Sequence, residues 1–156
     1  MTVGVLIIAH APLAAALAAA AAHVYACAPE RAGGQLRAFD VQPDSDTEAN
    51  VARARLLVSE VDSGTGVLVL TDAFGASPGN VATQLAEPGR VAVIAGVNLP
   101  MLLRALCYRD GSLAETAEKA LAGGAQGVMQ VASTAVQHQG VRVTQDDDLA
   151  RLHDQQ

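Results

Sequence analysis

Two side chains capable of chemistry stand directly after strongly apolar segments of the chain. His10 follows "VGVLIIA" (3–9), and Asp72 follows "GVLVLT" (66–71). Each segment is a short run of aliphatic and β-branched residues, a pattern typical of a strand covered on both faces. In parallel sheets, binding sites lie beyond the carboxyl ends of the strands. His10 and Asp72 are therefore the first candidates for a catalytic pair.

This pair would suit phosphoryl transfer. A carboxylate bonded to one imidazole nitrogen fixes the tautomer and leaves the other nitrogen unprotonated, as a nucleophile requires. The segment "AFGASPGN" (73–80) then places Gly75, Ser77 and Gly79 at an expected helix start, where free backbone N–H groups favour an anion. These residues predict in-line transfer of a phosphoryl group to Nε2 of His10, with Asp72 orienting the ring.

The same residues also have ordinary structural uses, which the pattern alone leaves open. A single histidine after a strand is often a bonded structural residue, and Asp72 or Ser77 would serve as a helix cap. His23 falls in an expected helix, and His138 and His153 fall in the C-terminal segment, so none of the three follows a strand as His10 does.

Composition narrows the functional class. The chain has 156 residues, 51% of them hydrophobic, which fits one domain with a substantial core. A net charge of -6 without a Lys/Arg cluster argues against nucleic-acid binding. The sequence has no Walker motif, GxGxxG or acidic metal cluster, so we expect no cofactor and no metal.

The N-terminal region and the cysteines favour a cytoplasmic protein. Residues 3–28 are nearly uncharged, but no Lys or Arg precedes them and His10 and Pro12 interrupt the run, so we expect neither export nor membrane insertion. Cys27 and Cys107 lack CxxC spacing, and we interpret both as reduced core residues.

The elements that must position the candidate pair alternate between strand and helix. We expect strands over 3–9, 35–41, 66–72 and 90–98 and a last short strand over 127–133. Expected helices cover 12–27, most of 43–64, a segment capped by Ser77 with Pro78 first, 100–109 and 112–122. This alternation predicts a doubly wound α/β fold, with a mostly parallel sheet between helices on both faces. The strand order 2-1-3-4 would bring His10 and Asp72 to the same edge.

Three segments together resemble the mannose-type enzyme IIA domains of the phosphoenolpyruvate-dependent phosphotransferase system. They are "VGVLIIAHAPLAAAL", "GVLVLTDAFGASPGNVA" and "VIAGVNLPMLLRAL", in the order and spacing of that family, and the resemblance covers about residues 1–132. It implies that His10 accepts a phosphoryl group from phospho-HPr and passes it to an enzyme IIB protein, with Asp72 orienting His10.

The resemblance also implies the surroundings of the phosphoryl group. Ser77 matches the serine of a Gly-x-Ser-Pro loop, Phe74 stands where the family often has tryptophan, and Gly75 belongs to the same loop. Ala11 follows His10 directly, at a position beside the phosphate where the family often has glycine. In the family a further segment borders the site, and this segment is matched here by Asn98, Pro100 and Met101.

The family is homodimeric, and its last strand crosses to the partner subunit. In this chain the candidate for that exchanged strand is "GVMQVAS" (127–133), followed by a polar tail over 133–156. No enzyme IIB domain is expected in so short a tail. Such a partner would then be a separate protein, and a purely regulatory phosphoacceptor stays open.

Three alternatives compete with this interpretation. The phosphotransfer subunit of phosphoenolpyruvate-dependent dihydroxyacetone kinases shares the histidine chemistry and the fold. A small tetrapyrrole metal chelatase would need a second histidine facing His10, and no other histidine stands at an expected strand end. A binding or regulatory module without catalysis would retain its partner after replacement of His10.

Overall fold

The computed structural model describes residues 1–131 and contains one parallel four-stranded sheet. The strands are β1 (Gly4–His10), β2 (Leu36–Val41), β3 (Val67–Thr71) and β4 (Val91–Ala95). Their order is β2-β1-β3-β4, and every neighbouring pair is parallel. The structure therefore confirms the predicted α/β class and strand order.

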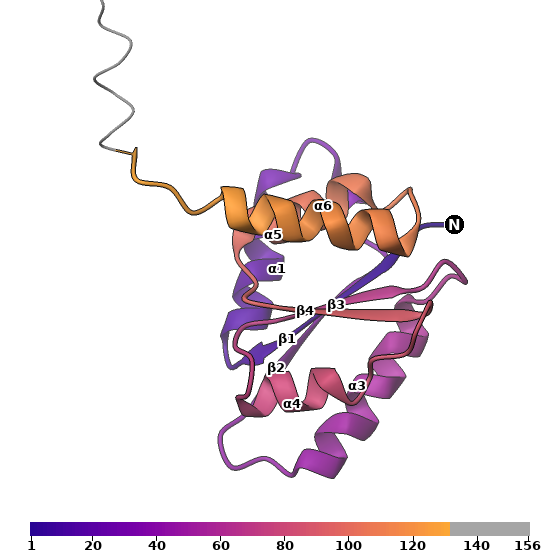
Figure 1. The fold of residues 1–156 in the computed structure, drawn as a ribbon, viewed down its shortest axis with the longest axis vertical. Helices are drawn as coiled ribbons and strands as arrows, with labels where there is room; N and C mark the ends of the chain where they lie inside the picture. The colour runs from indigo at the N-terminus through magenta and orange to yellow at the C-terminus, as the bar shows by residue number, and fades with distance from the viewer. Residues whose placement is uncertain (132–156) are drawn as a thin grey trace, which may run out of the picture.

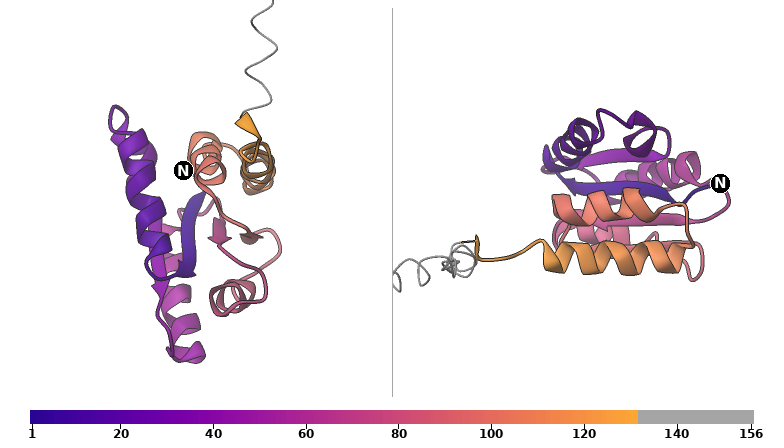
Figure 2. Two further views of the ribbon diagram at one scale, coloured as in Figure 1. Left: turned by 90° about the vertical axis from the view of Figure 1, so that its left-hand side faces the viewer. Right: turned by 90° about the horizontal axis from the view of Figure 1, so that it is seen from above.

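Helices cover both faces of this sheet (Figure 1). They are α1 (Leu13–Val24), α2 (Pro29–Ala32), α3 (Thr47–Val61), α4 (Ser77–Thr83), α5 (Leu99–Tyr108) and α6 (Leu113–Gln126). One core cluster joins the sheet to α3 and α4, and the other joins it to α1, α5 and α6. The left-hand view of Figure 2 keeps the vertical direction of Figure 1 and shows α5 and α6 above the sheet and α4 below it.

The two central strands explain why the candidate pair is so well anchored. All residues of β3 are buried, as are all residues of β1 except His10. Side chains alternate between faces, so Leu6 and Ile8 enter one core cluster while Val5 and Ile7 enter the other. The register pairs Ile8 with Thr71, which brings His10 and Asp72 to the same carboxyl edge.

The structure corrects the expected ends of two elements. The first helix ends at Val24, not near residue 27, and "PERA" forms the separate one-turn helix α2. The last helix continues to Gln126, beyond the expected end at 122. Proline at position 29 fits the start of a new helix because its missing N–H is not needed there.

The interpretation of Cys27 and Cys107 as core residues is wrong. Both are free and exposed. Cys27 lies beyond the end of α1, and Cys107 lies on the face of α5 opposite the buried Ala105 and Leu106. An apolar neighbourhood in the sequence therefore does not bury either thiol.

The expected last strand is not part of the sheet in this chain. Gly127 ends α6, residues 128–130 adopt no regular structure, and residues 132 and 133 lie outside the described part. An exchanged strand pairs only with a partner subunit, so the exchange stays a prediction. Over residues 1–131, no helix combines the length and the apolar character that crossing a membrane requires.

Candidate active site

The structure brings His10 and Asp72 into direct contact. Oδ2 of Asp72 lies 2.7 Å from Nδ1 of the His10 ring and also accepts the backbone N–H of His10 at 3.0 Å. Oδ1 of the same carboxylate accepts the N–H of Ala73 at 2.9 Å. The Asp72 side chain is 13% exposed, whereas that of His10 is 55% exposed. A largely covered carboxylate thus holds an accessible ring.

The carboxylate of Asp72 is stabilised in its charged form. Burial alone would raise the pKa of Asp72, but the hydrogen bonds from the His10 backbone, the His10 ring and the Ala73 backbone outweigh burial and lower it. A charged carboxylate on Nδ1 keeps the proton on that nitrogen. Nε2 is then the nitrogen available for reaction.

A cavity of about 450 Å³ opens beside His10. Its lining is His10, Ala11, Val41, Gln42, Pro43, Asp44, Ser45, Thr47, Asn50, Ser77 and Val81. The end of β2, the loop that follows it and the start of α3 together supply most of these residues. Hydrogen bonds from Ser45 to the Gln42 carbonyl and from Asn50 to Ser45 hold that loop. The sequence did not predict this side of the cavity, because polar residues between a strand and a helix are typical of an ordinary loop and helix cap.

The loop after Asp72 carries unpaired donors. Within residues 1–131, the backbone N–H groups of Phe74, Gly75, Ala76 and Ser77 donate to no other group. Gly75 has φ +81°, a left-handed conformation that glycine adopts without strain. Four successive free N–H groups beside the His10 and Asp72 pair are suited to binding an anion.

Ser77 does not cap α4 as expected. The helix begins with Ser77 itself, after Ala76 as N-cap, and no side chain caps it. Ser77 instead lines the cavity beside His10. Gly79 allows α4 to approach the loop closely, because a Cβ there would overlap the carbonyl oxygen of Ala73.

The α1 side of His10 differs from the α4 side, because most of its donors are already used; among the described residues only the N–H of Leu13 there has no partner. The N–H of Ala11 donates to the carbonyl of Val41 at 3.1 Å. Ala11 lines the cavity, but this bond must break before its N–H binds a phosphate. Asp40, which sequence reasoning missed, accepts the N–H groups of Ala14 and Ala15. No local pattern could link an aspartate in one strand to an earlier helix.

The expected border residues lie at the start of α5, where it packs against the end of α6. Asn98 caps α5 through Met101 and donates to the carbonyl of Gly124, while Met101 is 4% exposed and packs in the core. Pro100 lines a separate hollow with Tyr25 and Leu103. None of Asn98, Pro100 and Met101 lines the cavity beside His10. Their role at the site border stays a prediction.

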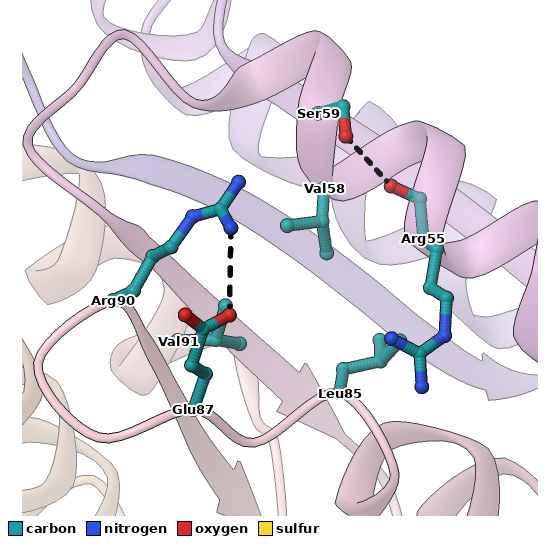
Figure 3. A pocket seen from close by; sticks show the side chains of 7 residues that line it. All are labelled: Arg55, Val58, Ser59, Leu85, Glu87, Arg90 and Val91. Atoms are coloured by element: carbon teal, nitrogen blue, oxygen red, sulfur yellow. Dashed lines mark hydrogen bonds and ion pairs between the residues drawn. The ribbon is translucent and has the colours of Figure 1, made fainter.

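A second, smaller cavity lies at the opposite edge of the sheet, beside the start of β4 (Figure 3). It measures about 120 Å³ and is flanked by Arg55 and Arg90. Arg90 pairs with Glu87 and Asp62, and Arg55 donates to the carbonyl of Gln84. Both arginine side chains at this cavity therefore already have partners. Among the described residues, no cluster of three or more His, Cys, Asp or Glu side chains could hold a metal.

Comparison with known sequences finds a family match over most of the chain. A family model described as the fructose IIA component of the PTS system matches residues 4–121. The mannose-specific EIIAB component of the PTS system of Escherichia coli (strain K12) is 32% identical over 102 residues, which are 64% of this chain. The same residues are 32% of that relative, so the chain spans about a third of its length.

Solved structures share the fold. The PTS IIA protein associated with the fucose utilization operon of Streptococcus pneumoniae superposes with a TM-score of 0.73 at 22% identity, over 86% of this chain and 97% of that one. The mannose/sorbose specific IIA subunit from Enterococcus faecalis gives a TM-score of 0.71 at 21% identity, over 84% and 96% of the two chains. At these identities the likeness supports the fold alone.

Proposed function

Because the chain belongs to the mannose-type enzyme IIA family of the phosphoenolpyruvate-dependent phosphotransferase system, we propose that it carries a phosphoryl group on Nε2 of His10. The contact between Asp72 and Nδ1 of His10 supports this role most directly. It supplies the two things a phosphohistidine carrier needs, a ring with one fixed proton and a free second nitrogen.

The proposed step exchanges one phosphorus–nitrogen bond for another. The lone pair of His10 Nε2 attacks phosphorus in line with the phosphohistidine nitrogen of phospho-HPr, whose bond to phosphorus breaks and whose electron pair stays on the donor ring. Positive charge that develops on the His10 ring is balanced by Asp72. The free N–H groups of residues 74–77 would bind the phosphoryl oxygens, with the Ser77 hydroxyl beside them.

The onward partner in this proposal is a separate enzyme IIB protein. The reverse of the same chemistry passes the phosphoryl group to it, for sugar uptake or for regulation. We place the protein in the cytoplasm, where both partners would meet it. The ring of His10 is accessible enough for two proteins to reach it in turn.

Labelling tests the proposal directly. The protein, phosphoenolpyruvate carrying ³²P, enzyme I and HPr are incubated together, and the label on the chain is counted for wild type and for His10→Gln. We expect wild type to take up label and His10→Gln to take up none. An unlabelled wild type, in a mixture where HPr itself is labelled, contradicts the proposed function.

The stability of the label identifies the labelled atom. A phosphoramidate on histidine is lost in mild acid and survives alkali. We expect the label on this chain to follow that pattern. Label that survives acid and is lost in alkali would place the phosphoryl group on a Ser or Thr hydroxyl, with Ser77→Ala as the next variant to label.

We also propose that the chain forms a homodimer through its last described segment. Among residues 1–131, β4 pairs only with β3, so in this part of the chain its outer edge has no partner beyond the bridge between Glu87 and Val91. Exposed Val128 and Met129, at 78% and 69%, directly follow α6. An unpaired edge and an exposed apolar segment complement each other when a second copy is present.

Sedimentation tests this dimer. Wild type is compared with the double variant Val128→Asp, Met129→Asp, and with Leu56→Asp as a control for an exposed apolar residue on α3. We expect wild type and Leu56→Asp to sediment as dimers and the double variant as a monomer. A monomeric wild type at micromolar concentration, or an unchanged double variant, rules out this interface.

A further inference from the structure

The start of α1 lacks a cap of its own. Pro12 is the N-cap residue and makes no side-chain hydrogen bond, and the first turn contains no acid. The first N–H groups of a helix have no partner within the helix and carry a partial positive charge. This helix begins three residues after His10, so its free donors would compete for any anion bound near the ring.

Asp40 fills this gap from a different element. Its Oδ1 accepts the N–H of Ala14 at 2.8 Å and the N–H of Ala15 at 3.2 Å. Asp40 belongs to β2, where it lies opposite Ala9 of β1. The cap therefore ties the first turn of α1 to the strand beside the one that ends in His10.

The adjoining turn is held in the same way. The N–H of Ala11 donates to the carbonyl of Val41, the residue after Asp40. Two neighbouring residues of β2 thus bind the chain on both sides of Pro12. On this side of His10 the donors of Ala11, Ala14 and Ala15 are used and only that of Leu13 is left, whereas all four donors of residues 74–77 are free among the described residues.

We propose that Asp40 is a positioning residue for phosphoryl transfer, which fixes the turn after His10 and withdraws the N–H groups of Ala14 and Ala15 from the phosphoryl group. The phosphoryl group is thereby directed to the loop after Asp72. This inference rests on the proposed function of His10. It assigns to Asp40 a role in the geometry of the reaction, with no direct contact to the reacting atoms.

Transfer kinetics provide the first test. Initial rates of labelling from phospho-HPr give kcat and KM for wild type, Asp40→Asn and Asp40→Ala. Asparagine retains an oxygen that accepts the same two N–H groups, so we expect Asp40→Asn to keep kcat within about twofold of wild type. A shift of the turn by a fraction of an ångström in Asp40→Ala should lower kcat about tenfold, with KM unchanged.

Ser112→Ala is the matched control. Ser112 caps α6 in a capping box with Glu115, away from the cavity beside His10. This variant loses a helix cap, as Asp40→Ala does, and we expect its kcat to equal that of wild type. A kcat for Asp40→Ala equal to wild type, or an equal loss in Asp40→Asn, overturns the inference.

A phosphate titration tests it without any donor protein. Inorganic phosphate is added to ¹⁵N-labelled wild-type protein, and the amide signals are followed by NMR. We expect the signals of residues 74–77 to move and those of Ala14 and Ala15 to stay, whereas in Asp40→Ala the Ala14 and Ala15 signals move as well. Movement of these two signals in wild type overturns the inference, even if Asp40→Ala does not fold.

The two tests separate this inference from the proposed function. If wild type takes no label from phospho-HPr, the proposed function fails while the phosphate titration still reports on Asp40. If wild type is labelled and Asp40→Ala is labelled at the same kcat, the proposed function stands and the inference about Asp40 fails.

Discussion

The carboxylate of Asp72 holds His10 at two points, the backbone N–H at 3.0 Å and the ring Nδ1 at 2.7 Å. One oxygen, Oδ2, makes both contacts, so the ring and the end of β1 are fixed by the same atom. Because Asp72 follows directly on the buried strand β3, the two central strands of the sheet determine where the ring lies.

Replacing Asp72 by asparagine removes the negative charge of the side chain while keeping its size and shape. An amide has one acceptor and one donor end, whereas the native carboxylate accepts from His10 and from Ala73. We expect Asp72→Asn to lower the transfer rate about 100-fold, through the wrong ring tautomer and the lost charge, and to cost about 1 kcal/mol of stability for one lost hydrogen bond. Labelling kinetics and urea unfolding measure the two effects.

An unchanged transfer rate in Asp72→Asn would refute the orienting role of Asp72. Asp44→Asn serves as the control for charge near the cavity, since Asp44 lines the cavity but, within residues 1–131, forms no hydrogen bond or ion pair with His10. Its transfer rate should stay close to that of wild type.

Phe74 is expected to anchor a partner protein. Its side chain is 87% exposed and lies two residues after Asp72, so a protein that docks onto His10 would cover it. We expect Phe74→Ala to raise the KM for phospho-HPr about tenfold, since a buried aromatic anchor contributes more than 1 kcal/mol to binding, with stability unchanged. Leu56→Ala, an exposed apolar residue on α3, is the control. Equal KM values for the two variants would exclude Phe74 from the interface.

The sequence predicted the sheet and the His10 and Asp72 pair because both depend on short-range signals. Two runs of aliphatic residues specify buried strands, and a polar residue at the end of each marks where the strand leaves the core. The strand order then follows from connection rules that hold for most α/β folds. Little tertiary information is needed to bring the two side chains together.

Other features depend on packing that the sequence does not record locally. The alanine-rich α1 has apolar residues all around, so its pattern gives no contrast between the core face and the exposed face, and Cys27 was placed in the core wrongly. Asp40 caps a helix that precedes it in the chain, which only the register of β1 with β2 reveals. The start of α4 depends on how the 73–76 loop enters the helix, which is why the predicted cap, Ser77, is the first residue of the helix instead.

Acid should destabilise the protein through Asp62 and Asp72. The pKa of Asp62 is lowered, chiefly by the hydrogen bond from the Gly64 N–H; Arg90 and the Gly66 N–H lower it further, while burial opposes them. The pKa of Asp72 is lowered as well. Both start from a usual value of 3.8. A lowered pKa means that the unfolded chain binds protons first as the pH falls, so these contributions are complete above about pH 4 and are lost below it.

Urea unfolding between about pH 7 and about pH 3 measures this loss. We expect the unfolding midpoint of wild type to fall in acid and Asp62→Asn to show a smaller fall, because one of the two groups no longer titrates. Asp44→Asn is the control; its φ of +58° is a conformation that asparagine accepts. An acid-induced fall in Asp62→Asn as large as in wild type would exclude Asp62 as a source.

Two buried threonines should respond oppositely to replacement by valine. The Thr71 hydroxyl is buried without a hydrogen-bond partner among the described residues, whereas the Thr116 hydroxyl donates to the carbonyls of Ser112 and Tyr108. Valine has nearly the same shape, so Thr71→Val removes an unpaired polar group and should raise the unfolding free energy by about 1 kcal/mol, while Thr116→Val should lower it by about 1 kcal/mol. Urea unfolding at neutral pH compares the two variants. A loss of stability in Thr71→Val as large as in Thr116→Val would show that the Thr71 hydroxyl is bonded in solution, for example to a buried water at the end of β3.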